Sequence, residues 1–81
     1  MTEMTREESH EIVSNVRLKI IKRMEEAATK GQWIGFASPD VIKGLVKSLK
    51  KDPSQWWSLA PQLYSQRFIS NDEAEVIVLP Y

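Results

Sequence analysis

With 81 residues, 42% of them hydrophobic and 27% charged, the chain is long enough for one folded domain, which excludes a second domain and a disordered tail. It contains no cysteine and one histidine, His10, so disulfides, thiolate zinc sites, cysteine nucleophiles and His-rich metal sites are excluded, and no cofactor is expected. The net charge is zero, but residues 1–11 carry −3, residues 12–51 carry +6 and residues 52–81 carry −3, so a charged partner would meet a basic middle between acidic ends.

The first expected element is a long amphipathic helix from about Arg6 to Lys30. Thr5 to Glu8 matches a capping box, and Gly31 is placed as a left-handed C-cap. Apolar residues recur between these signals at intervals of three or four, as one buried helix face requires. They include Val13, Val16, Ile20, Met24 and Ala27. Because the helix is long for so small a domain, its first turns are expected to project or to mediate a dimer.

Residues 31–36 are aromatic and apolar and contain two glycines, which indicates a short strand or a buried crossover. A second helix is expected to begin after Ser38, because Ser is a favoured N-cap and Pro39 suits the first helical position. Its expected buried stripe is Val41, Ile42, Leu45, Val46 and Leu49. Gly44 lies inside this helix at a cost of about 1 kcal/mol, which suggests close approach of another backbone.

Asp52 and Pro53 repeat the start signal ahead of a third helix. Pro61 falls inside that helix, which therefore either kinks there or stops and restarts. Trp56 and Trp57 are adjacent and point about 100° apart on a helix, so they cannot share one core pocket. One of the two indoles is expected to be partly exposed.

The C-terminal part predicts a β-hairpin. Residues 66–70 and 74–79 are β-prone, and Asn71, Asp72 and Glu73 between them suit a turn. The expected fold class is therefore α+β, with three helices, a short strand after the first helix and a C-terminal hairpin.

This order of elements resembles that of the winged-helix domain. The segment from Ser38 to Leu79 corresponds to its second helix, third helix and wing, with Leu63, then Phe68 and Ile69, then a charged turn before residues 75–78. The resemblance implies a DNA-binding fold whose third helix enters the major groove. Two features depart from the pattern: the third helix has no Lys or Arg before Arg67, and phosphate would repel the acidic hairpin turn.

Basic side chains form the first candidate binding surface. They recur along one side of the second helix and across successive turns of the first, so adjacent faces could neutralise several phosphates. The phosphate-contact candidates are Lys19, Arg23, Lys43, Lys47, Lys50 and Lys51, and the base-contact candidates are Gln55, Ser58 and Gln62. The alternative interpretation is a solvated face in which Lys22 pairs with Glu26.

Aromatic side chains form the second candidate surface. Trp56, Trp57 and Tyr64 are the partner-binding candidates, because exposed tryptophan is enriched at interaction hot spots. The alternative is that one indole packs in the core while the other covers the first helix.

The sequence predicts a binding protein without catalytic residues, since it contains no nucleophile and base constellation and no phosphate-binding glycine loop. The acidic clusters are explained by a helix start and a turn: Glu7, Glu8 and Glu11, and Asp72, Glu73 and Glu75. We expect a small cytoplasmic regulator with no membrane partner, because neither a signal peptide nor a span of roughly 20 apolar residues is visible.

DNA is narrowly favoured as its partner. The alternative is a protein target, for which the chain would be an adaptor or a small inhibitor, and a homodimer would complete a small core.

Overall fold

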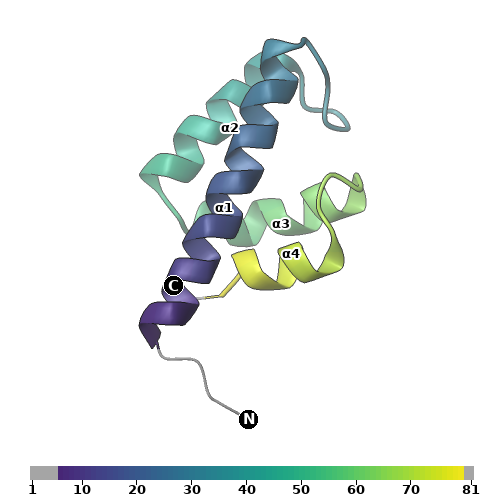
Figure 1. Ribbon diagram of the computed structural model, residues 1–81. Coiled ribbons are helices and arrows are strands. Elements are labelled where there is room, and N and C mark those ends of the chain that lie inside the picture. Colours follow the sequence, from purple (N-terminus) through teal and green to yellow (C-terminus); the bar gives the residue numbers. More distant parts are fainter. Residues whose placement is uncertain (1–5, 80–81) are drawn as a thin grey trace.

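The computed structural model describes residues 6–79, and these residues form four helices (Figure 1). The helices are α1 (Arg6–Thr29), α2 (Pro39–Lys51), α3 (Gln55–Ser65) and α4 (Asn71–Ile77). No strand occurs between residues 6 and 79, and the only β-type pairing there is an isolated antiparallel bridge between Ile34 and Ala37. The predicted α+β class is therefore wrong: neither a strand after the first helix nor a winged-helix-like hairpin forms in this range.

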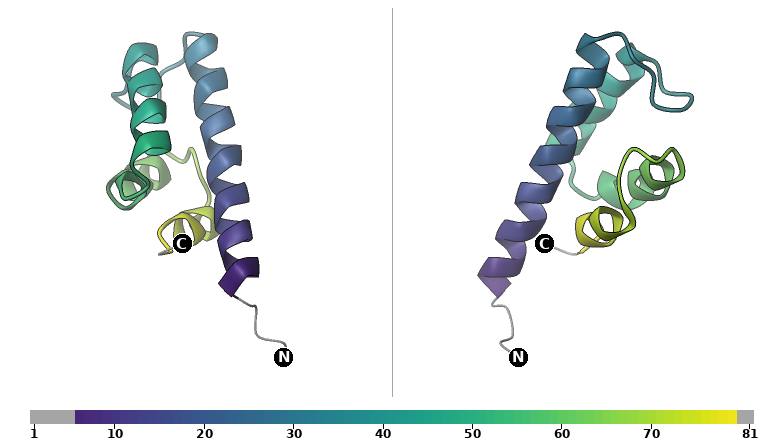
Figure 2. Two further views of the ribbon diagram at one scale, coloured as in Figure 1. Left: turned by 90° about the vertical axis from the view of Figure 1, so that its left-hand side faces the viewer. Right: turned by 45° about the vertical axis from the view of Figure 1, so that its right-hand side comes forward.

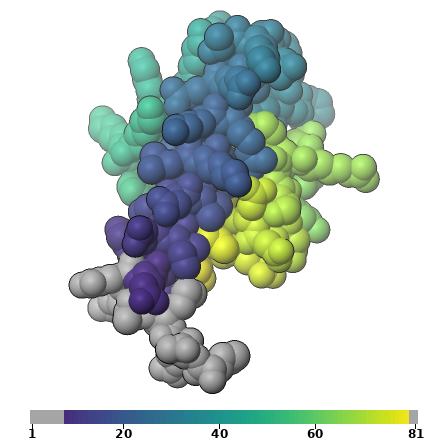
Figure 3. Space-filling model, in the orientation of Figure 1, coloured from purple at the N-terminus to yellow at the C-terminus, as the bar shows by residue number. Residues whose placement is uncertain are grey.

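The helices are arranged around α1, which packs against both α2 and α4, while α3 packs against α2 and α4. Figure 2 shows α2 running alongside α1, with α3 and α4 grouped below the loop that joins the first two helices. Figure 3 shows α1 crossing one face of the molecule with α4 along its side. The first turns of α1 extend past α4, as expected for a helix that is long for its domain (Figure 1).

The termini of α1 and α2 follow the signals in the sequence. At the end of α1, the Gln32 amide donates to the Ala27 carbonyl and the Gly31 amide to that of Ala28, while Gly31 adopts φ +72°. These two bonds form a Schellman motif, so the predicted C-cap is confirmed. Ser38 caps α2 by accepting from the Val41 amide, and Pro39 occupies the first turn. The predicted capping box at Thr5 lies outside the described residues.

The core is a single apolar cluster to which every helix contributes. Its buried members are Ile20, Ile21, Met24, Ala28, Ile42, Val46, Leu49, Trp56, Leu59, Ala60, Leu63, Ile69 and Ile77. The predicted stripes of α1 and α2 supply about half of it, although Val41 is half-exposed. The expectation for Gly44 is wrong, because a Cβ atom there would meet nothing within 4 Å.

α3 continues through Pro61 as one helix. It begins after a turn in which the Asp52 carboxylate accepts hydrogen bonds from the backbone and hydroxyl of Ser54. The hydroxyl bond is the main cause that lowers the pKa of Asp52. Trp56 is buried at 2% exposure and Trp57 is 48% exposed, so the predicted division between the two indoles is confirmed.

α4 occupies the segment for which the sequence predicted a hairpin. Its first turn is a complete capping box, in which the Ser70 hydroxyl accepts from the Glu73 amide and the Glu73 carboxylate accepts from the Ser70 amide. The Asn71 to Glu73 segment thus starts a helix instead of turning between two strands. Arg17 then binds the other end of α4 by donating to the carbonyls of Ile77 and Leu79 at 2.8 and 3.1 Å. Burial lowers the pKa of the Arg17 guanidinium.

Candidate functional site

Two hollows flank α3, one facing α4 and the other facing α2. The first, here called the α3–α4 hollow, has a volume of about 530 Å³. Its lining comes from α1, the end of α3, the loop after it and α4: Arg23, Tyr64, Ser65, Arg67, Phe68, Ile69, Ser70 and Glu73. The hollow therefore combines two arginines, one carboxylate and two aromatic rings.

Two half-exposed aromatic side chains lie on the α4 side of α3. Trp57 and Tyr64 are 48% and 49% exposed, and their spacing of seven residues places them about two turns apart on the same side of the helix. The indole N–H of Trp57 donates to the carbonyl of Val78, just beyond α4. This bond orients one edge of the indole and leaves much of its ring exposed to solvent.

Arg67 lies in the loop between α3 and α4 and has a left-handed backbone conformation, with φ +58°. The Phe68 amide donates to the Leu63 carbonyl and the Arg67 amide to that of Tyr64, which is again a Schellman motif. Glycine is the usual residue at this position, so Arg67 adopts an unfavourable backbone conformation. Within the described residues its guanidinium has neither an ion-pair nor a side-chain hydrogen-bond partner.

Arg23, by contrast, is held within the fold. Its guanidinium donates to the Glu73 carboxylate at 2.8 Å and lies 5.5 Å from the centre of the Phe68 ring. The hydrogen bond from the Ser70 amide is the main cause that lowers the pKa of Glu73, and Arg23 adds to the effect. Arg23 was predicted as a phosphate contact, but its observed role is to join α1 to α4.

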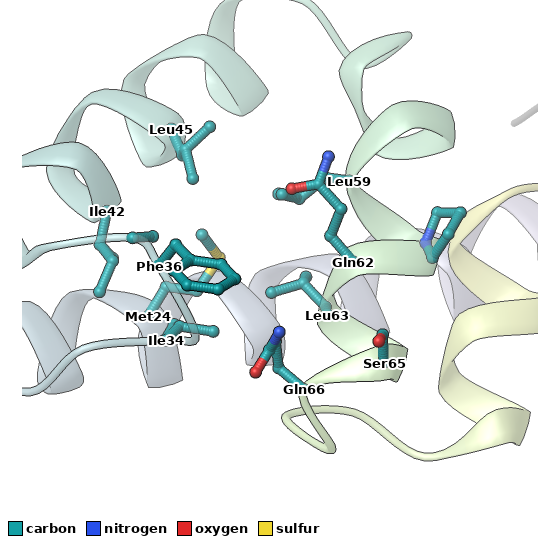
Figure 4. Close-up of a pocket in the computed structure, with 12 residues that line it drawn as sticks. Met24, Ile34, Phe36, Ile42, Leu45, Leu59, Gln62, Leu63, Ser65 and Gln66 are labelled. Carbon is teal, nitrogen blue, oxygen red and sulfur yellow. The ribbon is translucent and has the colours of Figure 1, made fainter.

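The second hollow, here called the α2–α3 hollow, is apolar and has a volume of about 330 Å³ (Figure 4). Its lining is Met24, Ile34, Phe36, Ala37, Ile42, Leu45, Leu59, Pro61, Gln62, Leu63, Ser65 and Gln66. A smaller depression of about 150 Å³ continues it along α2 and α3 and shares Leu45, Leu59 and Gln62 with it. Neither depression is lined by a charged side chain of residues 6–79.

A tight turn at residues 34–37 forms one wall of the α2–α3 hollow. Ile34 and Ala37 exchange two backbone hydrogen bonds of 3.1 and 2.9 Å, which leaves Gly35 and Phe36 at the tip. Gly35 has φ +59°, and a Cβ atom there would lie 2.5 Å from the side-chain amide carbon of Gln66. Phe36 is 97% exposed at the mouth of the hollow (Figure 4).

The predicted basic stripe does not form one continuous field. Lys50 pairs with Glu25 at 3.7 Å, so its charge is partly compensated. Lys19 is six residues from Glu25 and so lies about 120° around α1 from the side that faces Lys50. Exposed lysines without an ion-pair partner in the described chain remain on α2: Lys43, Lys47 and Lys51. Of the predicted surface pairs, Glu26 binds Lys30 instead of Lys22.

The predicted base-contact residues all lie beside the depression between α2 and α3. Gln55, Ser58 and Gln62 line its smaller part together with leucines, and Gln55 also donates to Asp52 at 3.4 Å. Trp56, predicted to contact a partner, is in the core and cannot present its ring at the surface. Trp57 and Tyr64 are the two aromatic candidates that the fold leaves accessible.

The acidic clusters do not form a metal site in the part of the chain that is described, where no group of three His, Asp or Glu side chains is close enough to hold an ion. His10 is exposed on α1, and Glu73 serves the capping box. None of the helices within residues 6–79 is both long and apolar enough to cross a membrane.

Sequence reasoning missed the roles of Phe36 and Arg67. Phe36 follows a glycine that could have signalled a tight turn, but only the fold shows that its ring lies beside a hollow. The sequence does not mark where α3 ends. It therefore could not show that Arg67 lies directly after this end. Compared with known protein families, curated proteins and solved structures, the chain matches none.

Proposed function

We propose that the chain is a small non-enzymatic regulator that binds another protein through the α3–α4 surface, defined here as Trp57, Tyr64, Arg67 and Phe68. The observation that carries the proposal is the placement of half-exposed Trp57 and Tyr64 on one side of α3, next to a hollow whose Arg67 guanidinium has no partner among residues 6–79. Tryptophan, tyrosine and arginine are the residue types most enriched at interaction hot spots.

The chemistry of the α3–α4 hollow favours a partner segment that presents a carboxylate next to an apolar side chain. Arg67 is available to a carboxylate, and the rings of Tyr64 and Phe68 supply apolar walls. The Arg23 guanidinium already binds Glu73, so Arg67 is the arginine of this hollow that has no ion-pair partner within residues 6–79. An adaptor or a small inhibitor that covers a partner's site is the corresponding mode of action.

DNA is the competing partner, and it has less support. Without the hairpin there is no wing to contact the minor groove, and Arg23 and Lys50 already have carboxylate partners. The remaining argument for DNA is three lysines of α2 that have no ion-pair partner in the described part of the chain: Lys43, Lys47 and Lys51.

The first test measures partner capture by the full chain in extracts of its host cells. Trp57→Ala and Tyr64→Ala should each lose a protein that wild type retains, because each change removes exposed aromatic area from the surface. Binding to the purified partner should weaken about 30-fold, which corresponds to roughly 2 kcal/mol for a hot spot. Leu18→Ala is the matched control, since Leu18 is exposed on α1 and lies outside the α3–α4 surface. Equal capture by all four chains would disprove the proposal.

The competing partner is tested by fluorescence anisotropy with a mixed-sequence DNA duplex at about 50 and 200 mM salt. We expect no binding that falls steeply with salt. Salt-dependent binding that Lys43→Glu combined with Lys47→Glu abolishes, and that Tyr64→Ala leaves intact, would assign the function to DNA and exclude the protein proposal.

A further inference from the structure

Phe36 has the most exposed large apolar side chain among the described residues, at 97%. The turn fixes this exposure, since both hydrogen bonds between Ile34 and Ala37 close around Gly35 and Phe36. Gly35 has the positive φ that the first central position of a type II′ turn requires. The Gln66 side chain packs directly against Gly35, which holds the turn against α3. Phe36 is therefore a pre-positioned apolar projection.

The α2–α3 hollow lies at the base of this projection, and Phe36 itself lines part of it. Its volume of about 330 Å³ is at the lower end of the range for ligand-binding pockets, roughly 300–1,000 Å³. Met24, Ile42 and Leu63 contribute buried apolar side chains to its lining. One face of the molecule thus carries both an apolar projection and an open apolar hollow (Figure 4).

We infer that a second copy of this chain covers this face, in a two-fold symmetric dimer in which Phe36 of each copy enters the α2–α3 hollow of the other. In a two-fold contact the same patch is used by both copies, so it must be complementary to itself. A projection next to a matching hollow satisfies this condition, because the symmetry axis then passes between the two features.

The charges of this face fit a second copy better than they fit a charged partner. Close to a two-fold axis each side chain approaches its own equivalent, so a charged residue there would face a like charge. The polar side chains that line the α2–α3 hollow are Gln62, Ser65 and Gln66, all uncharged. Amide and hydroxyl groups both donate and accept, so these side chains can bond to their own equivalents. The chain also has zero net charge, so no overall repulsion opposes association.

This inference goes beyond the proposed function and uses a different surface. The α2–α3 hollow lies on one side of α3, whereas Trp57 and Tyr64 lie on the side that faces α4. A dimer formed through Phe36 therefore leaves both aromatic side chains available to another protein. Two proposals on two surfaces can fail separately.

The experiment is sedimentation velocity of the full chain from about 1 μM to about 1 mM, with variants that circular dichroism shows to be folded. Wild type should sediment as a dimer at the upper concentrations. Phe36→Ser should raise the dimer dissociation constant at least about 30-fold, because it removes the projection without touching the core. Gln62→Glu should also raise the dimer dissociation constant, because it places a negative charge from each copy close to the symmetry axis. Leu18→Ser, exposed on α1, should dimerise like wild type.

A photoreactive benzophenone side chain at position 36 tests the contact itself. In an equal mixture of ¹⁴N- and ¹⁵N-labelled chains, it should join light to heavy peptides that contain Leu45 or Leu59. A wild-type monomer throughout the concentration range would overturn the inference, as would a dimer that survives Phe36→Ser or crosslinks confined to one copy. Since Phe36→Ser should still capture the partner that binds through Tyr64, its behaviour separates failure of the dimer from failure of the proposed function.

Discussion

Gly31 and Arg67 occupy the same position in two Schellman motifs, one after α1 and the other after α3. Both have positive φ, at 72° and 58°. Glycine adopts this region without a steric penalty, whereas an L-residue with a side chain is disfavoured there by about 1–2 kcal/mol. The end of α3 is therefore less stable than the same backbone would be with glycine.

Replacement of Arg67 tests this difference. Arg67→Gly should raise the free energy of unfolding by about 0.5–1 kcal/mol, because relief of the left-handed strain exceeds the extra entropy of an unfolded glycine. The same change should weaken binding of the proposed protein partner, since it removes the guanidinium that lines the α3–α4 hollow. Urea unfolding followed by circular dichroism gives the first quantity, and titration with the partner gives the second.

Gly31→Ala is the matched comparison for that measurement. A Cβ atom at Gly31 meets nothing within 4 Å, so the substitution has only a conformational cost, which should be about 1 kcal/mol of lost stability. Loss of stability in Arg67→Gly would mean that the packing of the Arg67 side chain outweighs the strain of its backbone.

Among the helices, α2 contains one glycine that its packing does not require. Gly44 is exposed and has open space where a Cβ atom would lie. Gly44→Ala should therefore raise the free energy of unfolding by about 1 kcal/mol, the difference in helix propensity. Ser48→Ala, at another exposed position of α2, should give about half that gain and serves as the control. A loss of stability on Gly44→Ala, measured by urea unfolding, would show that another surface contacts this turn.

The accuracy of sequence reasoning differed between the helices for a physical reason. α1 and α2 were predicted correctly because caps and apolar spacing agree over several turns. α4 was not predicted, because Val76 to Val78 are β-branched and suggested a strand. Its capping box at Ser70 and the burial of Ile77 in the core override that preference. For so short a helix, contacts with the remainder of the chain decide the conformation.

The candidate surfaces were predictable only in part. The helical angle between Trp56 and Trp57 was sufficient to expect one exposed indole, because it depends on adjacent residues alone. The hollows on either side of α3 combine residues from three or more segments, so no local pattern could indicate them. Local patterns also could not show that Arg23, predicted in the basic stripe, pairs with Glu73, because the two residues are 50 positions apart.

In the molecule as a whole, α4 is attached to α1 by polar bonds in addition to apolar packing. Arg17 donates to carbonyls at its C-terminal end, and Arg23 pairs with Glu73 in its first turn. These contacts join residues that are 50 or more positions apart, so they close the fold between its first and last helices. The strength of the Arg23–Glu73 pair should depend on pH, because Glu73 is a carboxylate, whereas Arg17 donates to backbone carbonyls.

The pH dependence has a definite sign. The pKa of Glu73 in the folded chain lies below its ordinary value of 4.5, so its contribution to stability is fully present above that value and is lost as pH falls through the lower folded-state pKa. We expect the free energy of unfolding to fall as the pH is lowered below 4.5, and Glu73→Gln to flatten this decline. The variant should lose about 0.5–1 kcal/mol at pH 7, since the ion pair is partly exposed.

Glutamine at position 73 can still complete the capping box, so the variant mainly removes the charge. Glu11→Gln, at an exposed position of α1, is the control and should leave the acid decline as it is in wild type. Identical pH profiles for wild type and Glu73→Gln, measured by urea unfolding across this range, would contradict the assignment to Glu73.

The three tryptophans occupy three different environments: Trp33 is 64% exposed on the loop after α1, Trp57 bonds to the end of α4, and Trp56 lies in the core. An indole emits at shorter wavelength in an apolar interior than in water, so we expect the buried Trp56 to emit at shorter wavelength than the exposed Trp33. On denaturation the emission of Trp56 should shift most, because its surroundings change most. Detachment of α4 should alter the surroundings of Trp57 first, since that indole bonds to the Val78 carbonyl, so the chain carries optical reporters of which part of the fold opens.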